Sequence, residues 1–461
     1  MPIPFQNTYA RLPESFFKPV NPIPVAEPRL IALNLELAEE LGIDPADLTV
    51  EVLSGNAIPE GAEPLAMAYS GHQFGGFSPV LGDGRAILLG EVAGKDIQLK
   101  GAGRTPFSRR GDGRSALGPV LREYLVSEAM AALGVPTTRA LAAVWSGEEV
   151  VREKMEPGGI FTRVASSHLR IGTAQYFTAH QDLESLEALV DYTISRHYPE
   201  AETALEVLEC VIARQASLVA RWMSLGFIHG VMNTDNMSLS GETIDYGPCA
   251  FMDRFDPAKK FSYIDQGGRY AYQNQPGIAH WNLTRLAEAL LPLIHDDPEK
   301  AVDLAKAALG KFPSLFQEAD HKNFSAKLGF PDGCDESLIE ALLDLMARQE
   351  ADFTLVFRHL SGEEADFLAQ FKDPEPLKIW LQHWRAEGDI DKECMRKVNP
   401  VFIPRNHRIE EVIAAGLQGD FEPFHRLHRI LQQPFDEQPE FAEFENTPKP
   451  EEVVCATFCG T

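Results

Sequence analysis

Apolar and polar residues alternate in the first part of the chain and follow helical spacing in the second. The segments AILLGEV (86–92) and DIQLK (96–100) have the pattern of two strands joined by a turn that contains Gly94. Further strands are expected near Ala140–Trp145 and Gly159–Val164. Beyond about Ser166 the apolar residues recur at three- and four-residue intervals, which is typical of helices. The pattern therefore predicts an α+β fold.

Several stretches carry the repeat of an amphipathic helix. Helices are expected over Arg29–Leu41, over Ser115–Leu133 with Ser115 as its N-cap, over Thr203–Leu225 and over Trp281–Ile294. Residues 300–431 are expected to continue as helices, and the acidic, proline-containing residues 432–461 to form a tail.

Lys100 belongs to the polar face of its predicted strand. In DIQLK, Ile97 and Leu99 lie on one face, so Gln98 and Lys100 point to the other face. We expect Lys100 to line a cleft there. Glu123 falls in the middle of the predicted helix that follows. A strand lysine followed by a helix glutamate matches the ion pair that orients a phosphate-binding lysine in protein kinases.

The segment Gly226–Pro248, GFIHGVMNTDNMSLSGETIDYGP, carries most of the candidate chemistry. Its apolar pieces MSL and TID flank Ser240-Gly241-Glu242, and a short hairpin there would bring Asn236 and Asp245 together. An amide and a carboxylate side by side suit a hard cation such as Mg²⁺ or Mn²⁺. The alternative is an ordinary loop whose polar groups satisfy the backbone.

The spacing of this segment is that of the kinase superfamily. His229, Asn236 and the triplet Asp245-Tyr246-Gly247 stand where a kinase has its catalytic-loop histidine, metal asparagine and metal aspartate. The order of motifs predicts a protein-kinase-like two-lobed fold with a β-rich N-lobe and an α-rich C-lobe. One position departs: Val231 stands where a kinase needs the aspartate that accepts the substrate proton. Asp235 is the carboxylate left in the loop for that role.

The predicted organisation has four parts. Residues 1–64 form an N-terminal extension, 65–180 the N-lobe, 181–330 the C-lobe with the catalytic and metal loops, and 331–461 a helical C-terminal extension with a cysteine-containing tail. A chain of 461 residues is long enough for two or three such units.

Glycine-rich loops and arginines supply candidate phosphate contacts. Gly82-Asp83-Gly84-Arg85 and Gly111-Asp112-Gly113-Arg114 allow the backbone to approach an anionic ligand, although each alone also fits a plain turn. Arg163 and Arg170 have a spacing that lets both face a triphosphate, and the alternative for them is surface ion pairing.

Charge and composition exclude several classes of function. Lys+Arg 42 against Asp+Glu 68 gives a net charge of -26, which disfavours nucleic acid and anionic membranes as partners, so an ATP site must gather its own cations. The first residues lack the pattern of a signal peptide, and no apolar run reaches membrane-spanning length. We expect a cytoplasmic monomer without a membrane segment. Its six scattered cysteines are expected to be mostly reduced.

Several long motifs resemble the selenoprotein O family, also called YdiU: LKGAGRTPFSRRGDGR, REYLVSEAMAALGVPTTRA, HGVMNTDNMS, GETIDYGP and QPGIAHWNL. The resemblance implies a pseudokinase-folded protein adenylyltransferase that binds ATP inverted and, with Mg²⁺ or Mn²⁺, transfers AMP to protein Ser, Thr or Tyr hydroxyls with release of pyrophosphate. Some members also transfer UMP. It implies Asp235 as proton acceptor, Asn236 and Asp245 as metal ligands, and nucleotide contacts from Gly82, Gly84, Arg85, Lys100, Asp112, Gly113, Arg163, Arg170 and Asp245. The kinase-like order of Lys100 and Glu123 gives Glu123 the role of an orienting residue.

Two other functions fit parts of the pattern. A small-molecule kinase of the aminoglycoside phosphotransferase type has a similar layout, but Val231 argues against it because that class also needs aspartate there. A non-catalytic, ATP-binding pseudokinase scaffold is the other alternative, and it has no need of the full set Lys100, Glu123, Asn236 and Asp245.

The positions of three cysteines suggest that the protein responds to redox conditions. Cys455 and Cys459 lie in the polar tail and Cys249 follows the Asp245-Tyr246-Gly247 triplet, so a disulfide from the tail to Cys249 would affect the site. The alternative is an inert, packed Cys249 and a frayed tail. The segment PAKKFSYIDQGG (257–268) lacks the His and Cys often found there in the family, which argues against a redox link through that loop.

Overall fold

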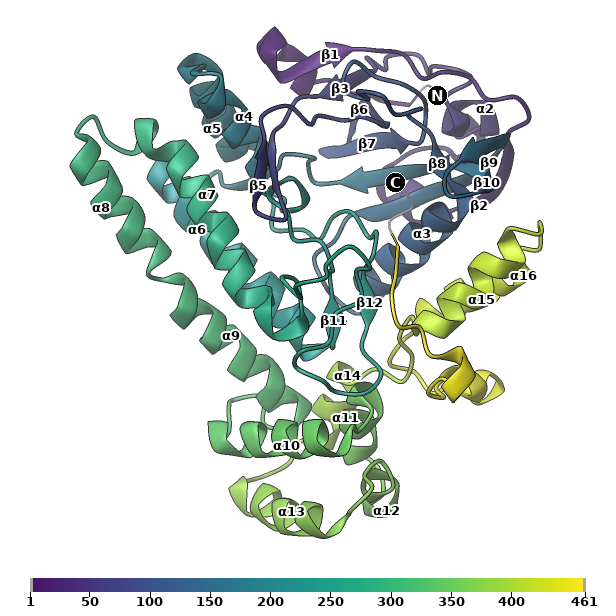
Figure 1. Cartoon of the computed structure of the whole chain (residues 1–461), viewed down its shortest axis with the longest axis vertical. Coiled ribbons are helices and arrows are strands. Elements are labelled where there is room, and N and C mark those ends of the chain that lie inside the picture. The colour runs from purple at the N-terminus through teal and green to yellow at the C-terminus, as the bar shows by residue number, and fades with distance from the viewer. Residues whose placement is uncertain (1–2, 459–461) are drawn as a thin grey trace.

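A sheet of eight strands forms one end of the molecule in the computed structural model, which describes residues 3–458 (Figure 1). The strand order is β1-β3-β6-β7-β10-β9-β2, β8 pairs with β10, and all the pairings are antiparallel. The bounds are β1 Phe17–Pro19, β2 Arg29–Leu33, β3 Leu65–Met67, β6 Ala86–Val92, β7 Lys95–Lys100, β8 Ser115–Ala116, β9 Arg139–Val151 and β10 Met155–Ala165. The mixed α/β composition expected from the sequence is confirmed.

The helices cover the sheet and build the rest of the molecule (Figure 1). Their bounds are α1 Leu35–Glu40, α2 Val50–Ser54, α3 Leu117–Ala132, α4 Ile171–Ala179, α5 Leu183–His197, α6 Ala204–Ser224, α7 Gln275–Ile294, α8 Pro298–Leu309, α9 Phe312–Lys327, α10 Glu336–Gln349, α11 Phe353–Leu360, α12 Glu364–Leu368, α13 Glu375–Glu387, α14 Lys392–Val398, α15 Asn406–Gly416 and α16 Glu422–Leu431. The short strands are β4 Gly71–Gln73, β5 Gly76–Ser78, β11 Phe227–Ile228 and β12 Ala250–Phe251. No helix among residues 3–458 combines the length and apolar character needed to cross a membrane.

The alternation in β7 has the predicted outcome. Ile97 and Leu99 are buried in one apolar cluster on the outer face of the sheet, together with residues of α1 and α2. Gln98 and Lys100 therefore point to the opposite face, toward α3, where their polar groups find partners. The predicted strands near 140–145 and 159–164 lie inside the longer β9 and β10.

Two predicted helix starts are wrong. Residues 29–33 form strand β2 rather than helix, because this short apolar run pairs with the edge of β9, for example Leu30 with Val144. The helix begins only at Leu35, where the Asn34 side chain accepts a hydrogen bond from the Leu37 amide. Ser115 is not an N-cap either, since it pairs with Gly159 in β8, and α3 begins at Leu117.

Helix α3 lies between the sheet and the pair α15 and α16, so it is buried on nearly all sides (Figure 1). Its apolar residues, among them Leu121 and Leu125, fill the cluster that also contains Ile409 of α15 and Phe424 of α16. This packing fixes Glu123 of α3 in the interior, 5% exposed, facing β7 and β10.

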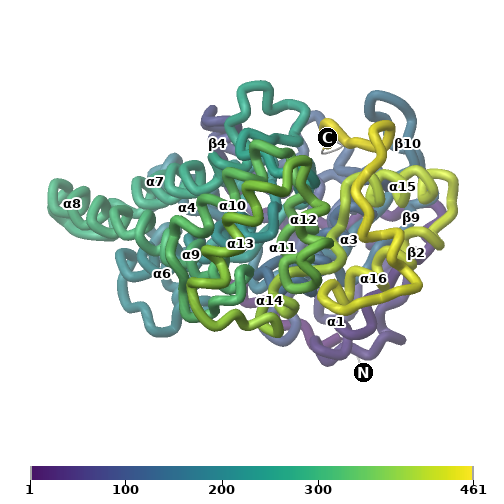
Figure 2. Tube along the Cα trace, turned by 90° about the horizontal axis from the view of Figure 1, so that it is seen from below, coloured from purple at the N-terminus to yellow at the C-terminus, as the bar shows by residue number. Residues whose placement is uncertain are grey.

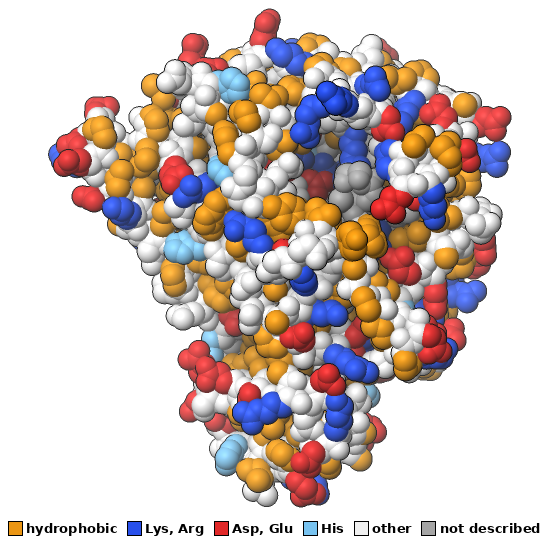
Figure 3. Space-filling view, in the orientation of Figure 1, with side chains coloured by type: hydrophobic (Ala, Val, Ile, Leu, Met, Phe, Trp, Pro, Cys, Tyr) orange, Lys and Arg blue, Asp and Glu red, His pale blue; other side chains and the backbone are white. Residues whose placement is uncertain are grey.

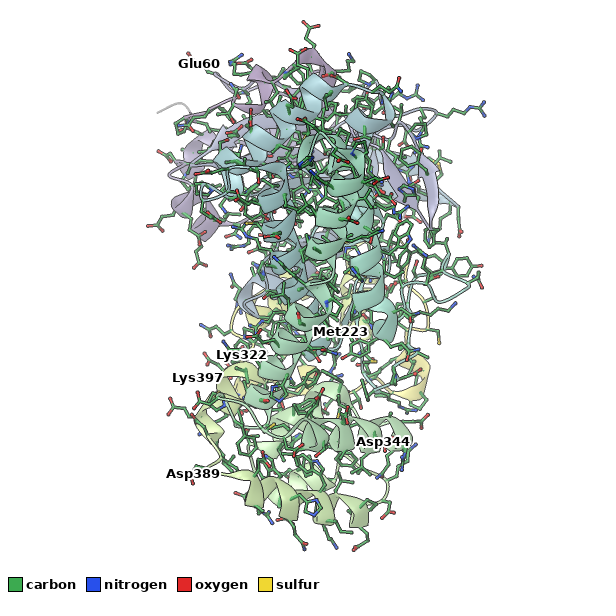
Figure 4. The ribbon with its side chains drawn as sticks, turned by 90° about the vertical axis from the view of Figure 1, so that its left-hand side faces the viewer. Glu60, Met223, Lys322, Asp344, Asp389 and Lys397 are labelled. Carbon is green, nitrogen blue, oxygen red and sulfur yellow. The ribbon has the colours of Figure 1, made fainter. Side chains whose placement is uncertain are left out.

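The long helices α6, α7 and α9 connect the sheet to a group of short helices at the opposite end (Figures 1 and 4). Helix α6 begins at a capping box in which the Thr203 and Glu206 side chains each bond to the backbone of the other. Figure 4 shows Glu60 at the sheet end, and Asp344 and Asp389 in the group α10–α14 at the other. The predicted helices at 203–225 and 300–431 are confirmed, and the one predicted at 281–294 is the second part of α7, which begins six residues earlier, at Gln275.

The acidic tail after residue 432 packs on the body (Figures 1 and 2). Arg358 pairs with Glu437, and the backbone oxygens of Glu443 and Glu445 accept hydrogen bonds from Arg408 and Arg405. These contacts hold the chain beyond α16 against α11 and the start of α15.

Candidate active site

The segment after α6 forms a loop held between the sheet and α7. Strand β11 pairs with β12, and the chain between them passes through a 3₁₀ turn, Thr234–Asn236, before it reaches Asp245. The predicted hairpin of MSL with TID does not form. Ser238 instead forms a bridge with Arg170, and Thr243 one with Thr137, because both flanks find partners in segments distant in sequence.

Asp245 is the centre of a cluster of cations. Its Oδ1 lies 2.7 Å from the Lys100 Nζ and 2.7 Å from an Arg163 guanidinium nitrogen, and its Oδ2 lies 3.7 Å from Arg170. Burial alone would raise the pKa of Asp245, but Lys100, Arg163 and Arg170 hold it well below its ordinary value. The backbone φ of +65° at Asp245 is unusual for a residue with a side chain and aims the carboxylate at this cluster.

The predicted ion pair between Lys100 and Glu123 is present. The Lys100 Nζ lies 2.6 Å from a Glu123 oxygen, and the other oxygen of Glu123 lies 3.4 Å from Arg163. Arg163 is 1% exposed and also donates to Gln98 at 2.6 Å, so its guanidinium is fixed in place. The Arg163 Nε also donates to the His168 ring. Neither Gln98 nor His168 was predicted from the sequence as a partner of Arg163. The position of Gln98 on the Lys100 face of β7 was an available signal.

The first glycine loop packs closely under the segment 105–108. Gly82 has a φ of +63°, and a Cβ there would overlap the Phe107 ring. The Ser108 hydroxyl donates to the Gly84 oxygen. Arg85 follows directly and lines a narrow cavity with Lys100 and Glu123 beside Tyr246 and Gly247. Figure 3 shows Lys and Arg side chains gathered along the upper rim of a hollow in this face of the molecule.

The second glycine loop is held by local contacts. The Asp112 carboxylate pairs with Arg152 at 2.8 Å and accepts a hydrogen bond from the Arg114 amide. The Gly113 oxygen accepts from the Gly103 amide, and the φ of Gly113 is +70°. The structure therefore joins Lys100, Glu123, Arg163, Arg170 and Asp245 through direct contacts. Within residues 3–458, neither Asp112 nor Gly113 makes a direct contact with this group.

Asp235 lies in the 3₁₀ turn with its carboxylate almost enclosed. It is 8% exposed, its Oδ2 accepts a hydrogen bond from the Gln73 amide at 3.3 Å, and its Oδ1 is buried without a hydrogen-bond partner among the described residues. Burial raises the pKa of Asp235 to about 6, against the opposing charge of Arg170. The raised pKa brings this carboxylate closer to the range in which a side chain exchanges a proton near neutral pH.

Asn236 and His229 complete the loop. The Asn236 Nδ2 donates to the Val231 oxygen at 3.0 Å, which orients the amide. His229 is fully buried, its Nε2 bonds to the Ile244 oxygen at 2.9 Å, and its backbone N–H donates to the Gln275 side chain. Burial lowers the pKa of His229, so the ring is neutral and links the loop to the segment that carries Asp245.

Comparison with known proteins agrees with this set of motifs. The sequence matches the family Protein adenylyltransferase SelO over residues 1–432. The chain belongs to the SelO family. It is 56% identical to a protein nucleotidyltransferase YdiU of Bradyrhizobium sp. strain BTAi1 over 99% of both chains. It is also 57% identical to a YdiU protein of Rhizobium etli over 99% of this chain and 97% of the relative, and 56% identical to one of Rhodopseudomonas palustris over 99% of both. The family resemblance seen in the motifs is confirmed.

The cysteines of this SelO-family chain are placed at different depths. Cys249 is 1% exposed, and burial raises the pKa of its thiol to about 12, whereas Cys455 is exposed. Cys459 lies outside the described residues. Nearby, the Thr457 hydroxyl donates to the Pro248 oxygen at 2.6 Å, and the Thr457 amide donates to the Phe261 oxygen. The tail thus contacts the residue that precedes Cys249, and the proposed disulfide stays a prediction.

Proposed function

We propose that this chain is a protein adenylyltransferase that transfers AMP from ATP to Ser, Thr or Tyr hydroxyls of proteins and releases pyrophosphate. The observation that carries the proposal is the arrangement of Lys100, Arg163 and Arg170 around Asp245, in a loop that has Val231 in place of a kinase base and Asp235 with an unshared oxygen. Membership of the SelO family supports it.

The kinase-like fold is part of the proposal. The sheet with α3 and α4 corresponds to an N-lobe, and α5–α9 to a C-lobe, with Lys100 on a strand, Glu123 on the next helix and Asp245 in a loop between the two parts. The division into residues 1–64, 65–180, 181–330 and 331–461 follows from it. We also propose that the protein acts in the cytoplasm as a monomer.

The cations suit a triphosphate whose terminal phosphates are buried. Arg163 and Arg170 are 1% and 2% exposed, and their charges are balanced by Asp245, Glu123 and Asp83. Oxygens of a bound triphosphate would take the place of some of these carboxylates as partners of the arginines. The arginines would then stabilise the negative charge that develops on the pyrophosphate as it leaves. Gly82, Gly84, Arg85, Asp112 and Gly113 are proposed to complete the nucleotide contacts.

The donor set fits a divalent metal ion. Asp245 offers carboxylate oxygens, and Asn236 has its Nδ2 occupied by Val231, which leaves its Oδ1 for a ligand. Mg²⁺ is typically held by one or two protein oxygens together with substrate phosphates and water, so these two residues are sufficient. Mg²⁺ or Mn²⁺ bound there would neutralise phosphate charge during the transfer.

The transfer itself is a displacement at the α-phosphorus. The acceptor hydroxyl oxygen forms a bond to that phosphorus, the bond to the β-phosphate oxygen breaks, and pyrophosphate leaves. The hydroxyl proton goes to Asp235, whose raised pKa matches it to this exchange near neutral pH. UTP as donor, with UMP transferred, uses the same steps.

The experiment is incubation of the protein with ATP labelled at the α- or at the γ-phosphate, with Mg²⁺ or Mn²⁺ and a bulk protein acceptor. The proposal expects protein-bound α-label and free pyrophosphate. Transfer of γ-label with release of ADP would indicate a kinase, and thermal stabilisation by ATP without any label transfer would indicate a scaffold.

A further inference from the structure

The β4–β5 hairpin lies against the turn that carries Asp235. Three successive residues of the hairpin contact three successive residues of the loop: the His72 amide donates to the Thr234 hydroxyl at 2.7 Å, the Gln73 side chain to Asp235 at 3.3 Å, and the Phe74 amide to the Asn233 side chain at 3.1 Å. Nothing in the hairpin's sequence, GHQFGGFS, predicted this contact.

The hairpin is held in one conformation by further contacts. The Gln175 side chain bonds to both His72 and Thr234, and the Tyr270 hydroxyl donates to the same Asn233 oxygen that Phe74 uses. Gln175 of α4 thus holds the hairpin at His72, and Tyr270, before α7, fixes the Asn233 side chain to which Phe74 bonds.

Its turn adopts a conformation that a phenylalanine seldom takes. Phe74 and Gly75 both have positive φ, +52° and +85°, as a two-residue hairpin turn requires, but the first of these positions usually carries Asn, Asp or Gly. The surrounding bonds to Asn233 and the ring contact with Tyr270 hold Phe74 there. Strain of this kind is characteristic of residues fixed by a functional site.

The hairpin also leaves no space beside the Oδ1 atom of Asp235. A Cβ at Gly71 would overlap the Asp235 Oδ1, so the hairpin backbone forms one wall around that atom. Gln73 itself is exposed, with its amide directed at Asp235. The hairpin therefore lies directly beside Asp235, with Gln73 at the surface.

We propose that Gln73 is a positioning residue, which fixes the orientation of the Asp235 carboxylate through Oδ2 for proton transfer from the acceptor hydroxyl. This inference rests on the proposed function. The Gln73–Asp235 distance of 3.3 Å is long for a hydrogen bond, and such bonds in an unliganded site often shorten when the reacting groups assemble. An acceptor that covers the exposed Gln73 would also remove competing water.

The test compares two substitutions that separate hydrogen bonding from packing. Gln73→Ala removes the donor, whereas Gln73→Glu keeps the shape but removes the donor and adds a negative charge beside Asp235. We expect kcat for transfer of α-labelled AMP to bulk casein and to the enzyme's own hydroxyls to fall about 10-fold in Gln73→Ala and further in Gln73→Glu, since hydrogen bonds to charged groups have effects of this size. The KM for ATP should not change.

Gln418→Ala and Gln418→Glu are matched controls, because Gln418 is an exposed glutamine beyond α15 whose side chain has no hydrogen bond among the described residues. Both should behave as wild type, and all four variants should keep its melting temperature. Gln73→Glu with near wild-type kcat would show that only the shape matters and would overturn the proposal. So would an unchanged Gln73→Ala. A wild-type protein that transfers no label would instead refute the proposed function itself, and the proposal with it.

Discussion

Replacing Asp245 by Asn should destabilise the protein in the absence of nucleotide, because it leaves Lys100, Arg163 and Arg170 close together without their shared counter-ion. Removing one partner of a buried ion pair costs about 3–5 kcal/mol. The Asp245 side chain is 21% exposed, and Glu123 and Asp83 remain as counter-ions, so we expect a smaller loss of about 2–3 kcal/mol. The melting temperature should fall by a few degrees.

The response to ATP should depend on the metal. In EDTA, ATP should raise the melting temperature of Asp245→Asn more than that of wild type. The triphosphate supplies the negative charge that the variant lacks, and it is no longer repelled by the Asp245 carboxylate. In Mg²⁺ the order should reverse, because wild type keeps both proposed metal ligands and the variant only Asn236. AMP transfer by Asp245→Asn should be lost in either case.

Thermal unfolding with ATP in EDTA and in Mg²⁺ provides the measurement. Asp332→Asn is the matched control, since Asp332 is exposed and has no ion pair among residues 3–458. If Asp245→Asn melts like wild type without nucleotide and responds to ATP in the same way in both conditions, the carboxylate does not balance the cation cluster and the reasoning is wrong.

Three further predictions concern other residues. Lys100→Ala should reduce AMP transfer more than Glu123→Gln, because Glu123 only orients the lysine and Arg163; initial rates with Glu123→Gln equal to wild type would contradict this. Thr457→Val should loosen the tail, because the substitution removes the hydrogen bond to the Pro248 oxygen. Limited proteolysis should then cleave the chain beyond α16 faster than in wild type; an unchanged cleavage rate would refute the anchoring role. Lys327→Met should stabilise the fold by about 1–3 kcal/mol at pH 6, because burial lowers the pKa of Lys327 to about 7 from 10.5. In the unfolded chain Lys327 stays protonated up to about pH 10, whereas in the folded protein it loses its proton near pH 7. The free energy of unfolding of the wild type should therefore rise relative to that of Lys327→Met between about pH 7 and 10. A difference in urea midpoints that does not change with pH would contradict this.

The parts of the site that could be predicted from the sequence depend on local periodicity. Strict alternation in β7 placed Lys100 and Gln98 on one face, and helical spacing placed Glu123 in the middle of α3, so the ion pair followed from the order of the two elements. The kinase-like spacing of His229, Asn236 and Asp245 is equally local.

The parts that were missed depend on partners distant in sequence. Residues 29–33 are too few for periodicity to separate strand from helix, and the edge of β9 decides the outcome. The turn at Gly241 was expected, but its flanks pair with Arg170 and Thr137 instead of each other. The contact of Gln73 with Asp235 spans 162 residues, and no spacing within the loop indicates it.

The most direct test of the account uses Asp235→Ala and Val231→Asp with ATP labelled at the α- or the γ-phosphate. If the hydroxyl attacks the α-phosphorus with Asp235 as base, Asp235→Ala should lower AMP transfer about 10²–10⁴-fold while ATP binding survives. Val231→Asp should not create γ-label transfer, because the terminal phosphates would lie among Lys100, Arg163 and Arg170. Transfer of γ-label by Val231→Asp, together with undiminished α-label transfer by Asp235→Ala, would contradict the account.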